Sequence, residues 1–92
     1  MSDSALPGGD FVEEGLRDLS RGATTISGLL VLIGAPRLRR LGYVVPPADE
    51  PDPERRLYET LAASGADSAH SRYNALIRRL VSFERAAECA SR

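Results

Sequence analysis

A short polar segment in the second half of the chain, His70 to Asn74, holds the residues best suited to acid–base chemistry. His70 follows Asp67 by three positions and precedes Asn74 by four, so either pair would share one face of a helix. Ser71 adjoins His70, and adjacent helical residues point away from each other, which argues against a serine triad. His70, Tyr73 and Asn74 therefore form a polar site at most, and the chain is predicted not to be an enzyme.

The sequence indicates neither a metal nor an organic cofactor. The single histidine, His70, and the single cysteine, Cys89, are nineteen positions apart, which leaves too few ligands for a metal cluster. The eight glycines are scattered, so none of them builds a glycine-rich loop for a phosphate group. We therefore expect no catalytic residues, no metal and no cofactor.

All twelve basic residues are arginine, whose planar guanidinium group suits carboxylates and phosphates. Near the C-terminus they fall in two rows on a helix, Arg72 with Arg79, and Arg78 with Arg85 and Arg92. The formal net charge is only −1, so this basic face belongs to a molecule that is not a polycation. The face predicts contact with an acidic protein surface or with nucleic acid, or else it is a solvated surface.

The elements that position these groups are expected to be helical, and the last helix, over residues 67–90, is the longest. Its apolar residues recur at alternating spacings of four and three, which is typical of a helix in a bundle or a coiled coil. They are Ala69, Tyr73, Leu76, Leu80, Phe83, Ala87 and Ala90. A length of about three heptads favours the bundle, so Leu76, Leu80 and Phe83 should be buried. In a parallel pair of such helices, Arg79 would bridge to Glu84.

Ile77 and Val81 widen the apolar arc of this helix to roughly half of its circumference. The preceding helix offers it only a narrow inner face of Leu57, Tyr58 and Leu61. Part of the arc must therefore meet the N-terminal half of the chain, a second copy, or another protein. This surplus makes Ile77 and Val81 candidate partner-binding residues.

The last two helices should form an antiparallel hairpin. A helix over 53–64 begins where Asp52 can cap it and proline suits its first position. Gly65 ends that helix, and Asp67 or Ser68 is the expected cap of the next. Because only a few residues separate the two helices, they must turn back on each other as an αα-hairpin.

The N-terminal half begins with an expected flexible leader over residues 1–9. Asp10 and Glu13 have the spacing of a capping box, which predicts the start of a helix over 10–21. Val12 and the leucines that follow it at helical spacing would form the buried face of this helix.

Residues 26–33 are apolar almost all round, and periodicity cannot decide between a buried helix and a buried strand. A cap at Thr24 or Thr25 and the following Gly34 favour a short helix. Another short helix is expected over 36–41. It carries a second basic cluster, interpreted as surface charge on a solvated turn: Arg37, Arg39 and Arg40.

Residues 43–53 form a linker in which four of eleven residues are proline and three are acidic, so an extended, unpacked segment is expected. The longest apolar run, residues 29–33, is far too short to span a bilayer. The start of the sequence has neither the basic nor the apolar stretch of a signal peptide. With its lone cysteine, the chain is therefore expected to be cytoplasmic and not to associate with membranes.

These features predict an all-α fold, a small bundle of four to five helices with a C-terminal αα-hairpin, in which 10–92 form one domain. The function that fits is a small binding or regulatory subunit, such as an antitoxin- or immunity-type inhibitor or an adaptor. Its partner would be a larger cognate protein or a second copy. The predicted partner-binding residues on the long helix are Arg72, Ile77, Arg78, Arg79, Val81 and Arg85. The alternative is a nucleic-acid-binding protein, although the last helix is longer than a typical recognition helix.

Overall fold

The computed structural model describes residues 8–90, and within them the chain forms helices and no strand. The helices are α1 (Gly9–Ser20), α2 (Ile26–Ile33), α3 (Ala35–Arg40) and α4 (Pro53–Ala90). The expected all-helical fold with a long C-terminal helix is thereby confirmed, and residues 26–33 are a helix. Of the leader expected at 1–9, residues 1–7 lie outside the described part of the chain.

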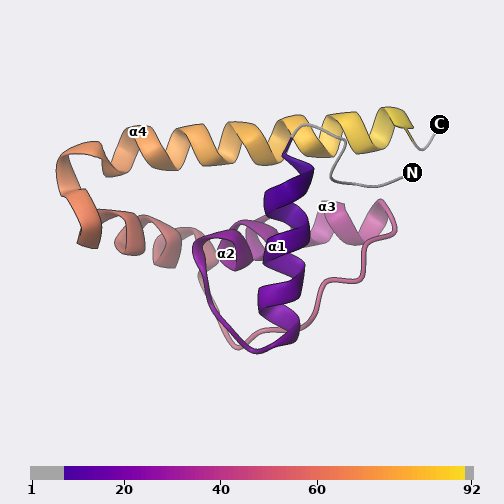
Figure 1. Cartoon of the computed structure of the whole chain (residues 1–92), viewed down its shortest axis with the longest axis horizontal. Coiled ribbons are helices and arrows are strands. Elements are labelled where there is room, and N and C mark those ends of the chain that lie inside the picture. Colours follow the sequence, from indigo (N-terminus) through magenta and orange to yellow (C-terminus); the bar gives the residue numbers. More distant parts are fainter. Residues whose placement is uncertain (1–7, 91–92) are drawn as a thin grey trace.

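Helix α4 consists of two arms that meet at Gly65, where the backbone is extended (φ 167°, ψ 88°) instead of helical. We call residues 53–64 the first arm and residues 66–90 the second arm. Figure 1 shows the first arm folded back beneath the second, which runs across the whole molecule. The expected αα-hairpin is therefore present, with a junction of a single residue.

Side chains of the two arms hold the hairpin together close to its turn. The Arg72 guanidinium donates a hydrogen bond to Ser64 Oγ (2.9 Å). The rings of Tyr58 and Tyr73 are tilted against each other with centroids 5.8 Å apart. Tyr58 was expected on the inner face with Leu57 and Leu61, but it stays largely exposed at the edge of the hairpin.

Two of the predicted caps are wrong. Asp67 and Ser68 lie inside the second arm, and the Ser68 hydroxyl donates to the Gly65 carbonyl oxygen (3.2 Å) instead of capping the helix. Asp10 lies in the first turn of α1, whose first residue is Gly9, and no side chain caps that helix. The Gly8 carbonyl already accepts a hydrogen bond from the backbone N–H of Val12 (3.3 Å), so helical bonding begins before Asp10.

The core lies where α2 is enclosed between α1 and the second arm of α4 (Figure 1). Leu80 and Phe83 are buried as expected, whereas Leu76 is only partly buried and Ala90 is exposed. The fully buried large side chains come from every helix: Phe83, Leu29, Leu30, Leu38, Leu57, Leu61, Val12 and Val31. The heptad-like spacing of the second arm therefore reflects packing within one chain.

The proline-rich linker is irregular, as expected, but its start packs against the core. Val45 is buried, and the Tyr43 ring lies 5.7 Å from the Phe83 ring, centroid to centroid. The Arg39 guanidinium donates to the Val45 carbonyl oxygen (3.2 Å) and holds the segment against α3. The linker is therefore part of the folded unit near Tyr43 and Val45, which composition alone did not indicate.

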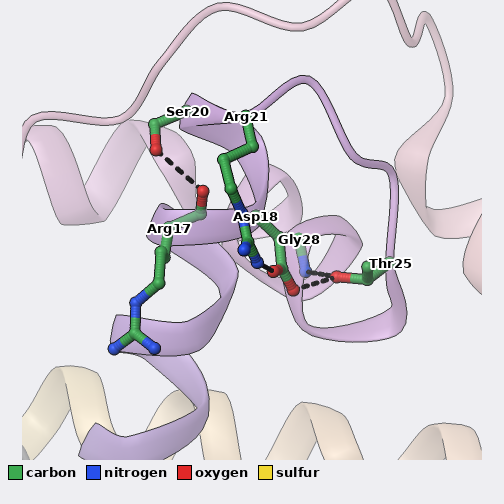
Figure 2. A network of polar contacts seen from close by, with 6 residues as sticks. All are labelled: Arg17, Asp18, Ser20, Arg21, Thr25 and Gly28. Carbon is green, nitrogen blue, oxygen red and sulfur yellow. Dashed lines mark hydrogen bonds and ion pairs between the residues drawn. The ribbon is translucent and has the colours of Figure 1, made fainter.

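The turn between α1 and α2 is built around the buried carboxylate of Asp18, as Figure 2 shows. This carboxylate accepts hydrogen bonds from the Thr25 hydroxyl (2.7 Å) and from the Arg21 guanidinium (2.7 Å). Thr25 Oγ1 accepts in turn from the backbone N–H of Gly28 (3.1 Å), which confirms Thr25 as the cap of α2. The turn is thus fixed by one polar network that joins the two helices.

The Asp18 network makes stability depend on pH in the acid range. The hydrogen bond from Thr25, and then that from Arg21, hold the pKa of Asp18 below its ordinary value of 3.8. Because the folded-state pKa is the lower one, the charged carboxylate stabilises the fold above the unfolded value, and this contribution is lost as the pH falls through the folded value. We expect Asp18→Asn to be less stable than the wild type near neutral pH, with the difference shrinking below pH 3.8.

Urea unfolding of the two proteins at several pH values measures this difference. Asp49→Asn, which changes an exposed acid outside the network, is the matched control and should show no such trend. A stability difference between wild type and Asp18→Asn that does not begin to shrink as the pH falls below 3.8 would contradict the assignment, because protonation of Asp18 in the unfolded chain must reduce it.

Candidate partner-binding surface

The surplus apolar arc of the second arm is only partly covered within the chain. Ile77 and Val81 are half-buried, and together with Ile33 and Pro36 they line an open hollow of about 280 Å³. We call these four side chains the apolar strip. Part of the arc expected to need a partner therefore meets the N-terminal half, and the rest remains at the surface.

The α2–α3 corner brings Ile33 and Pro36 to the second arm. At Gly34, between these two helices, a Cβ atom would lie 3.0 Å from Leu80 Cδ1 and 3.1 Å from Glu84 Oε2. Such distances are tighter than ordinary van der Waals contact, so glycine permits the corner to sit directly on α4. Ile33 on one side of this corner and Pro36 on the other then lie next to Ile77 and Val81 of the second arm.

A buried carboxylate lies at one end of the strip. Glu84 is 5% exposed, and its Oε1 lies 3.9 Å from the Arg37 guanidinium, which also binds Glu88 Oε2 at 2.7 Å. Burial raises the pKa of Glu84, against the opposing effect of Arg37 and Arg40. Within this chain Glu84 therefore pairs with Arg37, which joins α3 to α4 instead of being only surface charge.

The raised pKa of Glu84 predicts a stability change upon removal of its charge. A carboxyl whose folded-state pKa is raised stabilises the fold fully below its unfolded value of 4.5, and that contribution is lost as the pH rises through the folded value. Glu84→Gln keeps the shape and removes the charge, while Arg37 keeps Glu88 as its partner. We therefore expect this variant to be more stable than the wild type at neutral pH, with the gain disappearing below pH 4.5.

Thermal unfolding at neutral and acid pH measures the gain. Glu88→Gln is the matched control, because it removes the shorter bridge from Arg37 and should lower stability slightly at neutral pH. A Glu84→Gln variant that is less stable than the wild type at neutral pH would show that attraction to Arg37 outweighs the burial of the charge.

The arginines of the second arm do not form one continuous face. Arg79 is held by α1, since its guanidinium carbon lies 4.9 Å from the centroid of the Phe11 ring and its Nη2 lies 3.7 Å from Asp10 Oδ1. Arg72 is held by Ser64 of the first arm. These two predicted partner-binding residues therefore make contacts within the chain.

Arg78 and Arg85 differ from that pair. Both are exposed, and neither forms a hydrogen bond or ion pair with any described residue. Around the helix axis, Arg78 and Arg85 are rotated by about 100° or more from Arg72 and Arg79, and they lie on the side that carries Val81. They therefore border the apolar strip, whereas Arg92 of the same expected row lies outside the described residues.

The predicted polar site is divided between two sides of the second arm. Asn74 Nδ2 lies 3.1 Å from His70 Nε2, on the surface, so this pair is brought together. Tyr73 turns toward Tyr58 instead. Burial raises the pKa of Tyr73, and the charges of Glu54 and Asp52 add to this effect, so its hydroxyl stays protonated at neutral pH.

Residues 8–90 contain no group of three or more histidine, cysteine or acidic side chains placed to hold a metal ion. Within the same residues, no helix is long and apolar enough to cross a membrane. No family model, curated protein or solved structure matches the chain. The surface must therefore be interpreted from its own chemistry.

Sequence reasoning identified Ile77 and Val81 but missed the residues that complete this surface from the other half of the chain. Ile33, Pro36 and Arg40 line the same hollow, although more than thirty positions separate them from Ile77 and Val81. The only local signal was the Gly34-Ala35-Pro36 sequence, which predicts a sharp corner between two short helices without indicating which element lies beneath it.

Proposed function

We propose that this protein is a small, non-catalytic regulatory or adaptor subunit that binds a protein partner through the apolar strip. The observation that carries the proposal is the half-exposed pair Ile77 and Val81, continued by Ile33 and Pro36 and bordered by the unpaired Arg78. Apolar side chains surrounded by polar groups are typical of protein interaction sites.

The size of the chain supports this proposal. A chain of 92 residues buries a modest fraction of its surface and is only marginally stable alone. A partner that binds only the folded state would stabilise it by mass action. Covering Ile77 and Val81 would also remove half-buried apolar side chains from water.

Nucleic-acid binding through the arginine rows has less support. Arg72 and Arg79 make contacts within the chain, so Arg78 and Arg85 alone would be free for phosphates along the described part of the second arm. Two phosphate contacts on a chain with net charge −1 would give only weak attraction.

The proposal is tested by the size of the native complex. The tagged wild type, Val81→Glu and the control Ala63→Glu are sedimented from extracts of the cells that make the protein, after nuclease treatment. The control adds the same charge at an exposed site on the first arm. We expect the wild type and the control to sediment together with one other protein at a fixed ratio. Val81→Glu should sediment alone, and circular dichroism checks that this variant is folded. A wild type that sediments as a 9.9 kDa monomer, or a complex that survives Val81→Glu or disappears with nuclease, would contradict the proposal.

A further inference from the structure

We infer that the occupant of the apolar strip is an acidic amphipathic helix of the partner. This inference rests on the proposed function and adds the chemistry of the bound segment. The helix would place its apolar side chains on Ile77, Val81 and the α2–α3 corner, and its carboxylates against Arg78 and Arg85.

Cations border the strip along both edges. On one edge, Arg40 of α3 lines the same hollow, and on the other, Arg78 and Arg85 follow the exposed side of the second arm. Arg78 and Arg85 form no hydrogen bond or ion pair with a described residue, whereas the charge of Arg40 already acts on the buried carboxylate of Glu84. A ligand that matches this surface needs negative charge beside an apolar face, and carboxylates bind guanidinium groups in a planar, paired geometry.

The acidic side chains nearby offset the arginines of α3 but not those of the second arm. Glu84 is buried beneath the strip, and both Glu84 and Glu88 lie against Arg37. The acids are therefore used in joining α3 to α4, and the arginines left without an acidic partner are Arg78 and Arg85 of the second arm.

The shape of the strip suits a helix. Ile77 and Val81 are four positions apart, so they lie one above the other on one side of the second arm. Ile33 and Pro36 line the same hollow from the α2–α3 corner, so the bound segment would contact both this corner and the second arm. An amphipathic helix whose apolar side chains recur at positions i, i+3 or i+4, and i+7 would turn one apolar face toward these residues.

A second copy of this chain fits the strip poorly. In a two-fold symmetric dimer the same patch meets itself, so the arginines of one protomer would face those of the other. Like charges across an interface are repulsive, and the acids that could relieve this repulsion are already held by Arg37.

The test uses the full chain and two fluorescein-labelled helical peptides that share one leucine face. One carries glutamates on both flanks of that face and the other carries lysines. Fluorescence anisotropy measures their binding to the wild type, to Arg78→Glu/Arg85→Glu, and to the control Arg17→Glu/Arg56→Glu. The control reverses two exposed arginines away from the strip and gives the same net charge.

We expect the glutamate peptide to bind the wild type and the control at least about tenfold more tightly than the lysine peptide. Arg78→Glu/Arg85→Glu should reverse this preference, and Val81→Glu should weaken binding of both peptides by about tenfold. Equal binding of the two peptides, an equal effect of the control, or no binding at about 1 mM would overturn the inference. If the peptide test fails but the native complex is lost in Val81→Glu, the inference about the acidic helix is wrong and the proposed function still stands. The two experiments therefore distinguish failure of the inference from failure of the proposed function.

Discussion

Replacing Phe83 with alanine is expected to lower the free energy of unfolding by about 3–5 kcal/mol. Phe83 is completely buried, and its ring packs against that of Tyr43 from the linker. Truncation removes its apolar contacts and leaves a cavity that the surrounding helices can fill only in part. Because small domains have only about 5–15 kcal/mol of stability, the variant should unfold at a much lower urea concentration or fail to fold.

Phe83→Leu is the matched control, because it keeps most of the apolar volume. We expect it to cost less than about 1.5 kcal/mol, as volume-conserving substitutions in cores usually do. A Phe83→Ala variant within about 0.5 kcal/mol of the wild type would mean that Phe83 lies at the surface, and would contradict the packing of the linker on the second arm.

The second large effect is expected at Gly15, where α1 crosses α2. Alanine in place of glycine normally stabilises a helix by about 0.5–1 kcal/mol. Here, however, a Cβ atom would lie 2.4 Å from the Ser27 carbonyl oxygen and 2.6 Å from Val31 Cγ2. Since the nearest atom belongs to the backbone, the two helices must separate, and we expect Gly15→Ala to cost about 1–3 kcal/mol.

Gly28 provides the comparison. It is also a helical glycine, but a Cβ atom there would be no closer than 3.4 Å to any neighbour, an ordinary contact. Gly28→Ala should therefore stabilise the protein by up to about 1 kcal/mol. Urea unfolding of both variants measures the difference in sign. A stabilising Gly15→Ala would show that α1 and α2 do not pack as closely as described.

Local signals in the sequence predicted the elements well. Thr25 caps α2, and Asp52 accepts a hydrogen bond from the backbone N–H of Arg55 (3.2 Å) at the start of α4, both as expected. These caps act within one helical turn, so the residues that determine them are neighbours in the sequence. Asp67 failed because the second arm begins immediately after Gly65, so that Asp67 already lies in its first turn.

The candidate surface was less predictable, because contacts between distant segments determine it. The width of the apolar arc indicated Ile77 and Val81, but nothing near them in the sequence indicated that the α2–α3 corner would lie alongside. The partners of the arginines were equally hidden. Arg79 is held by Asp10 and the Phe11 ring, which lie almost seventy positions earlier in the sequence. Helical spacing alone therefore grouped Arg79 with the other arginines on one basic face, although in the fold its contacts separate it from Arg78 and Arg85.

The most direct test of the central proposal is photo-crosslinking in the cells that make this protein. A photo-reactive phenylalanine analogue replaces Val81 in the strip, or Ala63 on the exposed side of the first arm as the control. The proposal predicts that the position-81 protein, and not the position-63 protein, attaches to one partner through a segment whose sequence reads as an acidic amphipathic helix. Attachment at both positions alike, attachment to nucleic acid, or no attachment at position 81 would contradict it.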